Sequence, residues 1–314
     1  MFNIAVQTGG LEEFFGIDGA YRVISEAGFD GVDANLDHLM SYGDIIDKKI
    51  PIAFAGSELD VVEAARPWKE AANKYGLDNY QAHAPFPSLH TANPDEKEWN
   101  DWLVDDMLRK TIIATASIGC HNLIIHPFFR DYEHQMDHQE EWDVNIERYS
   151  RLAKTAKENG VVINLENMFF SKKDKIYGTV CNDGVMAAKY VDALNEAAGE
   201  KVFGFCLDTG HSLLASKDIK QFMTDMGDRI TCFHVHDNDG VNDLHQAPYT
   251  GKLDWDRFIE GLRAIRFNKT LSFETFNAVR TVDRELIPET LKYIAACGRM
   301  FDRKASCVTG DGSY

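Results

Sequence analysis

Four polar side chains stand at or near the carboxyl ends of successive apolar segments in the second half of the chain. They are Glu166, Asp208, His236 and Glu274, in the segments VVINLENMFF, FGFCLDTGH, ITCFHVHDND and TLSFETF. Burying three carboxylates and an imidazole together is costly unless a cation compensates their charge. Oxygen and nitrogen donors of this kind suit Mn²⁺, Zn²⁺, Co²⁺ or Mg²⁺. We therefore expect these four residues to bind a divalent metal ion.

A second group of polar residues extends this pattern. Its members are His83, His126, His211, Asp243 and His245. His211 follows Asp208 by three residues, in the loop after the expected strand, where its ring can turn toward the same pocket. His234 and His236 are two residues apart on one strand and point to the same side of it. We choose His236 as the metal ligand, and leave His234 open between a hydrogen-bonded core residue and a residue that supports the ligands.

Two residues of the segment GKLDW are further candidates for substrate contact. Aromatic rings pack well against the C–H faces of sugars, so we expect Trp255 to form part of a pocket wall. Lys252 is a candidate for binding a phosphate or carboxylate group, and is otherwise a solvated surface residue.

Short apolar segments alternate with amphipathic ones along the chain, which is the pattern of βα units around a parallel sheet. The expected strands are at residues 2–7, 30–34, 79–84, 122–127, 161–166, 202–207, 230–236 and 270–275. An open doubly wound sheet has the same alternation, but polar residues at six or more strand ends favour a barrel, whose active site lies at that face. We predict an α/β fold with a single (β/α)8 TIM barrel over residues 1–300, followed by a C-terminal tail over residues 301–314.

The composition restricts the class of protein. Fifty acidic residues against 33 basic ones give a formal charge of −17, which disfavours nucleic acid and other polyanions as partners. The six cysteines form no Cys-x-x-Cys pair, which argues against a disulfide framework or a zinc ribbon. Neither a signal-peptide pattern nor a run of 18 apolar residues is present. We therefore expect a cytoplasmic protein that does not enter a membrane.

The segments LENMFF, LDTGH, HVHDNDG, DLHQAPYTGKLDW and FETF resemble those of the xylose isomerase-like TIM barrels. This superfamily contains sugar and sugar phosphate isomerases and epimerases of carbohydrate metabolism, and endonuclease IV as a nuclease branch. The resemblance covers nearly the whole chain. It implies a divalent-metal enzyme that moves a proton next to a metal-polarised carbonyl, acts on a small-molecule carbohydrate and can form a homo-oligomer.

The resemblance also implies roles for individual residues. The metal ligands would be Glu166, Asp208, His236 and Glu274. Glu166 and Glu274 would also transfer the proton, with His211 as a third catalytic candidate that contacts a substrate hydroxyl or carbonyl. The substrate-binding candidates are His83, His126, His245, Lys252 and Trp255. Ketose 3-epimerases carry a glutamate six residues after the first ligand and an arginine six residues after the metal histidine. Lys172 and Asn242 stand there, which argues against a free-ketose 3-epimerase and leaves the general class open.

Endonuclease IV implies a rival function, a multinuclear zinc phosphodiesterase. Its three-zinc site is matched at all nine positions, which adds possible metal ligands to the first four. The nine are His83, His126, Glu166, Asp208, His211, His236, Asp243, His245 and Glu274. The net negative charge of the chain and the absence of Arg- and Lys-rich loops that could hold duplex DNA argue against this function. A third class, a binding module without catalysis, is disfavoured because folding alone does not require such an array.

Overall fold

The computed structural model describes residues 2–90, 95–130, 135–172 and 175–306. Eight parallel strands form one sheet in the order β10-β1-β2-β3-β4-β5-β8-β9. They are β1 (Asn3–Gln7), β2 (Gly31–Asn35), β3 (Asp78–His83), β4 (Asn122–Ile124), β5 (Val162–Glu166), β8 (Phe203–Asp208), β9 (Ile230–His234) and β10 (Thr270–Phe273). A parallel bridge from Val235 to Phe273 joins the two ends of this order, so the sheet forms a nearly closed barrel. The predicted single (β/α)8 TIM barrel is confirmed.

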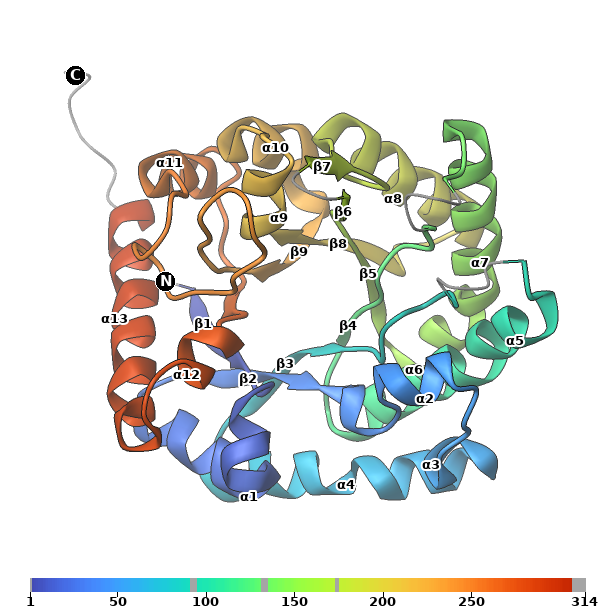
Figure 1. Cartoon of the computed structure of the whole chain (residues 1–314), viewed down its shortest axis with the longest axis horizontal. Helices are drawn as coiled ribbons and strands as arrows, with labels where there is room; N and C mark the ends of the chain where they lie inside the picture. The colour runs from blue at the N-terminus through green and yellow to red at the C-terminus, as the bar shows by residue number, and fades with distance from the viewer. Residues whose placement is uncertain (1, 91–94, 131–134, 173–174, 307–314) are drawn as a thin grey trace.

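Helices form an outer ring around the strands (Figure 1). The longer ones are α1 (Leu11–Glu26), α4 (Glu58–Tyr75), α6 (Arg109–Ser117), α7 (His138–Asn159), α8 (Gly184–Ala198), α10 (Ile219–Met226), α11 (Trp255–Ala264) and α13 (Ile287–Ser306). The short ones are α2 (Tyr42–Ile46), α3 (Ile52–Ala55), α5 (Lys97–Trp102), α9 (Thr209–Leu214) and α12 (Phe276–Arg280). The described residues also form three 3-10 helices, η1 (Leu36–His38), η4 (Gly227–Arg229) and η5 (Arg284–Leu286), and a π-helix, η2 (Leu103–Leu108). None of the described helices is both long and apolar enough to cross a membrane.

Local sequence signals determine where α7 and β5 begin. Asp137 caps α7, because its side chain accepts from the backbone N–H of Glu140 while the Glu140 side chain accepts from the backbone N–H of Asp137. The helix ends at Gly160, whose φ of 64° is a left-handed conformation that glycine adopts without strain. The chain can therefore turn back at once and enter β5 at Val162.

Three strands end two or three residues earlier than predicted. β4 ends at Ile124, β9 at His234 and β10 at Phe273, because regular ladder pairing stops there. The side chains of His126, His236 and Glu274 therefore belong to the first residues of the loops that follow the strands. A two-stranded hairpin, β6 (Phe169–Lys172) with β7 (Lys175–Gly178), follows β5 and was not predicted.

The predicted tail over residues 301–314 is wrong at its start. α13 continues to Ser306, and Phe301 is fully buried. The Phe301 ring stacks on Trp255, with ring centroids 5.1 Å apart, and also contacts Phe258 and Phe273. This aromatic packing keeps residues 301–306 in the helix despite their polar neighbours. Residues 307–314 lie outside the described part of the chain.

Candidate metal and substrate site

A cavity of about 500 Å³ opens at the carboxyl ends of the strands. Seven of the predicted site residues line it: His83, His126, Glu166, His211, Asp243, His245 and Glu274. Asp208 and His236 are fully buried and contact each other, with His236 Nε2 2.9 Å from Asp208 Oδ2. The structure thus brings all nine residues of the predicted array to one end of the barrel.

A first group of potential metal ligands lies at the ends of β5, β8, β9 and β10. It consists of Glu166, Asp208, His234 and Glu274, whose donor atoms lie within 4.8 Å of one another. His234 Nδ1 is 3.0 Å from Glu166 Oε1 and 3.4 Å from Glu274 Oε2. The structure therefore places His234, rather than the predicted ligand His236, among the three carboxylates.

The other nitrogen of His234 is also occupied. His234 Nε2 lies 3.1 Å from Asp33 Oδ2, so both ring nitrogens of His234 face carboxylate oxygens. His236 differs, because its Nδ1 atom is buried without a hydrogen-bond partner among the described residues. His236 therefore has one nitrogen without a partner, whereas both nitrogens of His234 face carboxylates.

A second group joins the ends of β3 and β4 to the first. It consists of His83, His126 and Glu166. His126 Nε2 lies 2.9 Å from His83 Nε2 and 3.1 Å from Glu166 Oε2. His83 Nδ1 donates to the carbonyl oxygen of Ala84 at 2.8 Å, which leaves the lone pair of a neutral His83 on Nε2, directed at the site.

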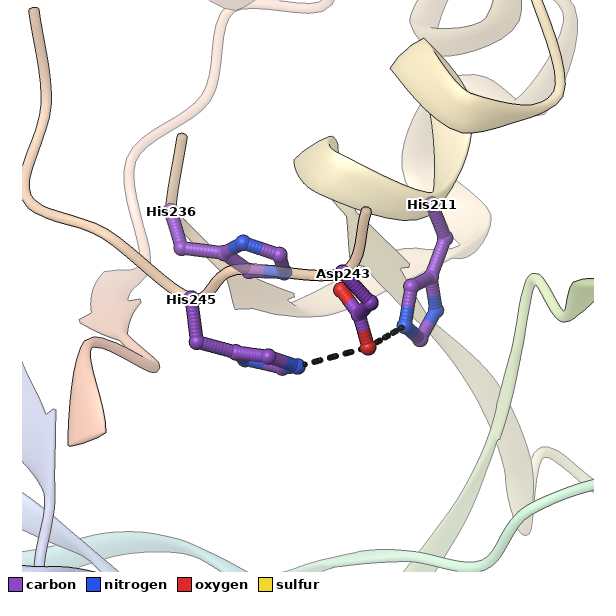
Figure 2. A group of neighbouring side chains, drawn as sticks. All are labelled: His211, His236, Asp243 and His245. Carbon is purple, nitrogen blue, oxygen red and sulfur yellow. Dashed lines mark hydrogen bonds and ion pairs between the residues drawn. The ribbon is translucent and has the colours of Figure 1, made fainter. Parts of the chain in front are cut away.

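The third group consists of His211, His236, Asp243 and His245. Figure 2 shows the rings of His236 and His245 stacked, and the Asp243 carboxylate reaching both His245 and His211. Asp243 Oδ2 is 2.9 Å from His245 Nε2 and 3.6 Å from His211 Nε2. The other oxygen of Asp243 is buried without a hydrogen-bond partner in the described structure, and could accept a cation.

The two glutamates of the site, Glu166 and Glu274, both have lowered pKa values. Burial alone raises the pKa of Glu166, but the imidazoles of His234 and His126 outweigh burial and hold this pKa well below its usual range. His234 and His245 likewise lower the pKa of Glu274 against the effect of burial.

Protons on the histidines balance part of this negative charge. Burial lowers the pKa of His211, but Asp208, Asp243 and Glu166 outweigh burial and raise it to about 10. Metal binding replaces such protons, because a ligating imidazole must be neutral. The donor set, the unpartnered buried atoms and the excess of carboxylates therefore fit a divalent cation.

The loop that carries Asp243 and His245 is held by Asp237, which the sequence analysis did not single out. The Asp237 carboxylate accepts from the backbone N–H groups of Gly251 and Leu253, both at 3.0 Å, and from Trp255 Nε1 at 3.1 Å. These hydrogen bonds fold the loop back over the barrel end.

Neither of the two substrate-contact candidates in GKLDW reaches the cavity. Trp255 is buried by its contacts with Asp237 and Phe301, so the prediction that it forms a pocket wall is corrected. Lys252 is exposed, and its backbone N–H donates to the carbonyl oxygen of Asn238 at 2.8 Å. Neither residue lines the cavity, because the turn that Asp237 holds directs this segment toward α13.

Aromatic side chains supply the apolar wall of the cavity. Phe86, Phe129, Phe169 and Phe276 line it, and the ring centroid of Phe169 lies 5.0 Å from that of His211. Phe169 belongs to the β6–β7 hairpin, which therefore forms one side of the cavity. The available signal for this hairpin was a pair of short segments rich in β-forming residues, FF and IY, on either side of the polar segment SKKDK.

Comparison with known proteins relates this geometry to one family. A family model described as xylose isomerase-like TIM barrel matches residues 21–297. In sequence, the chain is 25% identical to the uncharacterized protein y4fM of Sinorhizobium fredii over 306 residues, which cover 88% of this chain and 85% of that protein. In structure, it is similar to L-ribulose 3-epimerase, with a TM-score of 0.71 and 17% identity over 100% of both chains. It is also similar to the IolI protein with a bound zinc atom, with a TM-score of 0.61 and 17% identity over 97% of this chain and 98% of that one.

Proposed function

The chain belongs to the xylose isomerase-like TIM barrel family, and we propose that it is a divalent-metal-dependent isomerase or epimerase. Its substrate would be a sugar, a sugar phosphate or a related polyol. The observation that carries this proposal is the position of Glu166 and Glu274, which line one cavity and both contact His234. The similarity to L-ribulose 3-epimerase and to zinc-bound IolI supports the same class of reaction and a metal cofactor.

The metal ion would be held by Glu166, Asp208, His236 and Glu274. Although His234 lies among the three carboxylates, His236 is preferred because its Nε2 atom lies 2.9 Å from Asp208 Oδ2 and its Nδ1 atom has no partner among the described residues. When bound, the ion supplies a positive charge that polarises a substrate carbonyl and the neighbouring hydroxyl. Mn²⁺, Zn²⁺, Co²⁺ and Mg²⁺ all suit this mixture of oxygen and nitrogen donors.

Glu166 and Glu274 are proposed to carry the proton. Both are ionised, so either can accept a proton from the carbon next to the carbonyl. Gln7 Nε2 donates to Glu274 Oε1 at 2.6 Å and holds this carboxylate in place. Return of the proton to the opposite face of the same carbon would give an epimer, and return to the neighbouring carbon would give an isomer.

The remaining lining residues would orient the substrate. His211 Nδ1 donates to the carbonyl oxygen of Asn167 at 2.9 Å, which fixes its ring and leaves Nε2 facing the cavity side. His83, His126 and His245 offer further polar contacts for substrate hydroxyls. The phenylalanine wall, with Phe169 above His211, suits the C–H face of a sugar.

The ketose 3-epimerase signature is incomplete in this chain, so the proposal is the general isomerase and epimerase class. Asn242 is exposed, and its side chain donates to Asp239 Oδ2 at 2.9 Å, so it does not take the place of the arginine of those enzymes. Lys172 lies in β6 at the place of their second glutamate. We propose a cytoplasmic enzyme, with a homo-oligomer as the expected assembly.

The rival function, a trinuclear zinc phosphodiesterase, uses the same nine residues. It also needs cations to clamp a phosphodiester. Of the described residues that line the cavity, Arg280 is the only lysine or arginine, and its guanidinium already pairs with Glu13. This lining favours a neutral or weakly charged carbohydrate over a nucleic acid.

The test begins with the metal content of protein purified without added metal or chelator. The protein is then incubated with ketoses, aldoses and their phosphates in D₂O, and deuterium incorporation next to the carbonyl is measured. We expect about one ion per chain and exchange that Glu274→Gln abolishes. Glu289→Gln is the matched control, because this exposed glutamate of α13 contacts Lys292 instead. Three zinc ions per chain with cleavage of abasic-site DNA, and no sugar exchange, would favour the phosphodiesterase.

A further inference from the structure

We propose that Asp33 is a positioning residue, which holds His234 and, through it, the two glutamates of the site. The inference rests on the proposed function in so far as those glutamates bind the metal and move the proton. Asp33 lies in the middle of β2, within the segment GVDAN, and is fully buried. A carboxylate inside an apolar strand is costly to bury, so its presence calls for partners that use its charge.

Three donors from three other strands converge on one oxygen of Asp33. Gln81 Nε2 of β3 donates to Asp33 Oδ2 at 2.7 Å, and Ser272 Oγ of β10 lies 3.4 Å from the same atom. His234 Nε2 of β9 completes the set at 3.1 Å. Gln81 Nε2 is also 3.1 Å from the carbonyl oxygen of Phe233, the residue before His234, so it contacts the backbone that carries the imidazole.

The opposite edge of the imidazole faces the site. His234 Nδ1 contacts Glu166 Oε1 at 3.0 Å and Glu274 Oε2 at 3.4 Å. The ring therefore lies between Asp33 and the two glutamates. Its Nε2 atom faces Asp33, and its Nδ1 atom faces both glutamates. Asp33 fixes the rotation of the ring, because rotation away from Glu166 would also break the Asp33 contact.

This arrangement supports the ligands in the way that outer residues support other metal sites. Asp33 orients His234, and His234 in turn orients the two glutamates. The positions of the glutamates are therefore restricted before the metal binds. Loss of such an outer partner commonly costs about 10- to 100-fold in metal affinity or activity. Ordinary packing does not require Asp33, because an apolar residue would fill the same space without the desolvation cost.

The test is Asp33→Asn in the full chain, with Mn²⁺ alone as the probe. We expect the Kd for Mn²⁺ to rise about 10- to 100-fold. We expect kcat on the sugar substrate to fall with little change in KM, because Asp33 does not line the cavity. Far-ultraviolet circular dichroism should match the wild type.

Asp30→Asn is the matched control. Asp30 precedes the same strand, but its carboxylate pairs with Arg299 at 2.7 and 2.8 Å and has no contact with His234. This variant should lose stability and keep the wild-type Kd for Mn²⁺.

A second variant keeps the proposal testable if Asp33→Asn does not fold. Gln81→Met removes one donor to Asp33 at similar volume, and should raise the Kd for Mn²⁺ by a smaller factor. Wild-type Mn²⁺ affinity in the folded variants would overturn the role of Asp33. Absence of sugar exchange by the wild-type protein would instead overturn the proposed function, and the Mn²⁺ titrations would still decide the role of Asp33.

Discussion

The Nε2 atoms of His83 and His126 lie 2.9 Å apart, although the two residues come from different strand ends. His83 donates through Nδ1 to a backbone carbonyl, and burial lowers the pKa of His126. Both rings also line the cavity. We therefore expect this histidine pair to contact the substrate.

Replacing His126 with alanine should weaken substrate binding and spare the primary ion. We expect KM to rise about tenfold, which corresponds to a loss of about 1.4 kcal/mol. The metal content should stay at the wild-type value, because Glu166 keeps its other partners. The control is His121→Ala, an exposed histidine outside the cavity. Loss of one ion from the His126 variant would mean that His83 and His126 are metal ligands.

Changing Asp243 to asparagine and His245 to glutamine in one variant distinguishes a site that holds one metal ion from a site that holds several. A one-metal isomerase should retain its ion and lose turnover, since both residues line the cavity. Elemental analysis of the purified variant measures the ion, and the D₂O exchange assay measures turnover. A drop of one zinc per chain would show that the third group, with His211 and His236, binds its own cation.

Truncating Phe169 tests the aromatic wall. Phe169→Ala removes a ring that lies 5.0 Å from the His211 ring. A ring contact of this kind contributes about 0.5–1.5 kcal/mol, so KM should rise by up to about tenfold while kcat changes little. Steady-state kinetics on the accepted sugar provide the measurement. An unchanged KM would show that the Phe169 ring of the β6–β7 hairpin does not contribute to substrate binding.

Asp237→Asn should destabilise the loop that presents Asp243 and His245. The amide retains one acceptor oxygen but loses the charge that four N–H donors share, at a cost of about 1–3 kcal/mol in unfolding free energy. Urea denaturation measures this loss. Asp239→Asn serves as the control, because Asp239 bonds the same loop at the exposed surface. Equal stability of the two variants would contradict the role of Asp237.

The ion pair of His38 with Glu12 should make stability depend on pH. His38 Nε2 lies 2.8 Å from Glu12 Oε2, and this hydrogen bond raises the pKa of His38 above its value in the unfolded chain, about 6.5. The stabilisation is therefore complete below about pH 6.5 and is lost as the pH rises through the higher folded pKa. His38 is partly exposed, so the effect should stay below about 1 kcal/mol.

Unfolding free energies of the wild type and His38→Gln test this pH dependence. The difference between the two proteins should be larger at pH 6 than at pH 9. A difference that grows toward pH 9 would contradict the assigned direction of the pKa shift.

Much of the fold and part of the site follow from local sequence. The alternation of apolar segments with amphipathic ones is a short-range property, so it indicated eight strands and a barrel. Glu166 ends β5 as predicted, and Asp208 ends β8 one residue after the predicted end, because a strand end is set by neighbouring residues. Parallel strands carry their ends to one face, so the meeting of the nine polar residues could also be predicted.

Contacts between distant segments needed the tertiary structure. Two histidines that share one strand face cannot be told apart until Asp33, 201 residues away, is seen to occupy Nε2 of His234. Tryptophan is a residue type that often packs against sugars, but contacts with Asp237 and Phe301 hold the Trp255 side chain in the core. Residue types and spacing therefore determined which chemistry the chain can carry. The three-dimensional packing decided which groups face the cavity, because that depends on hydrogen bonds between strands far apart in sequence.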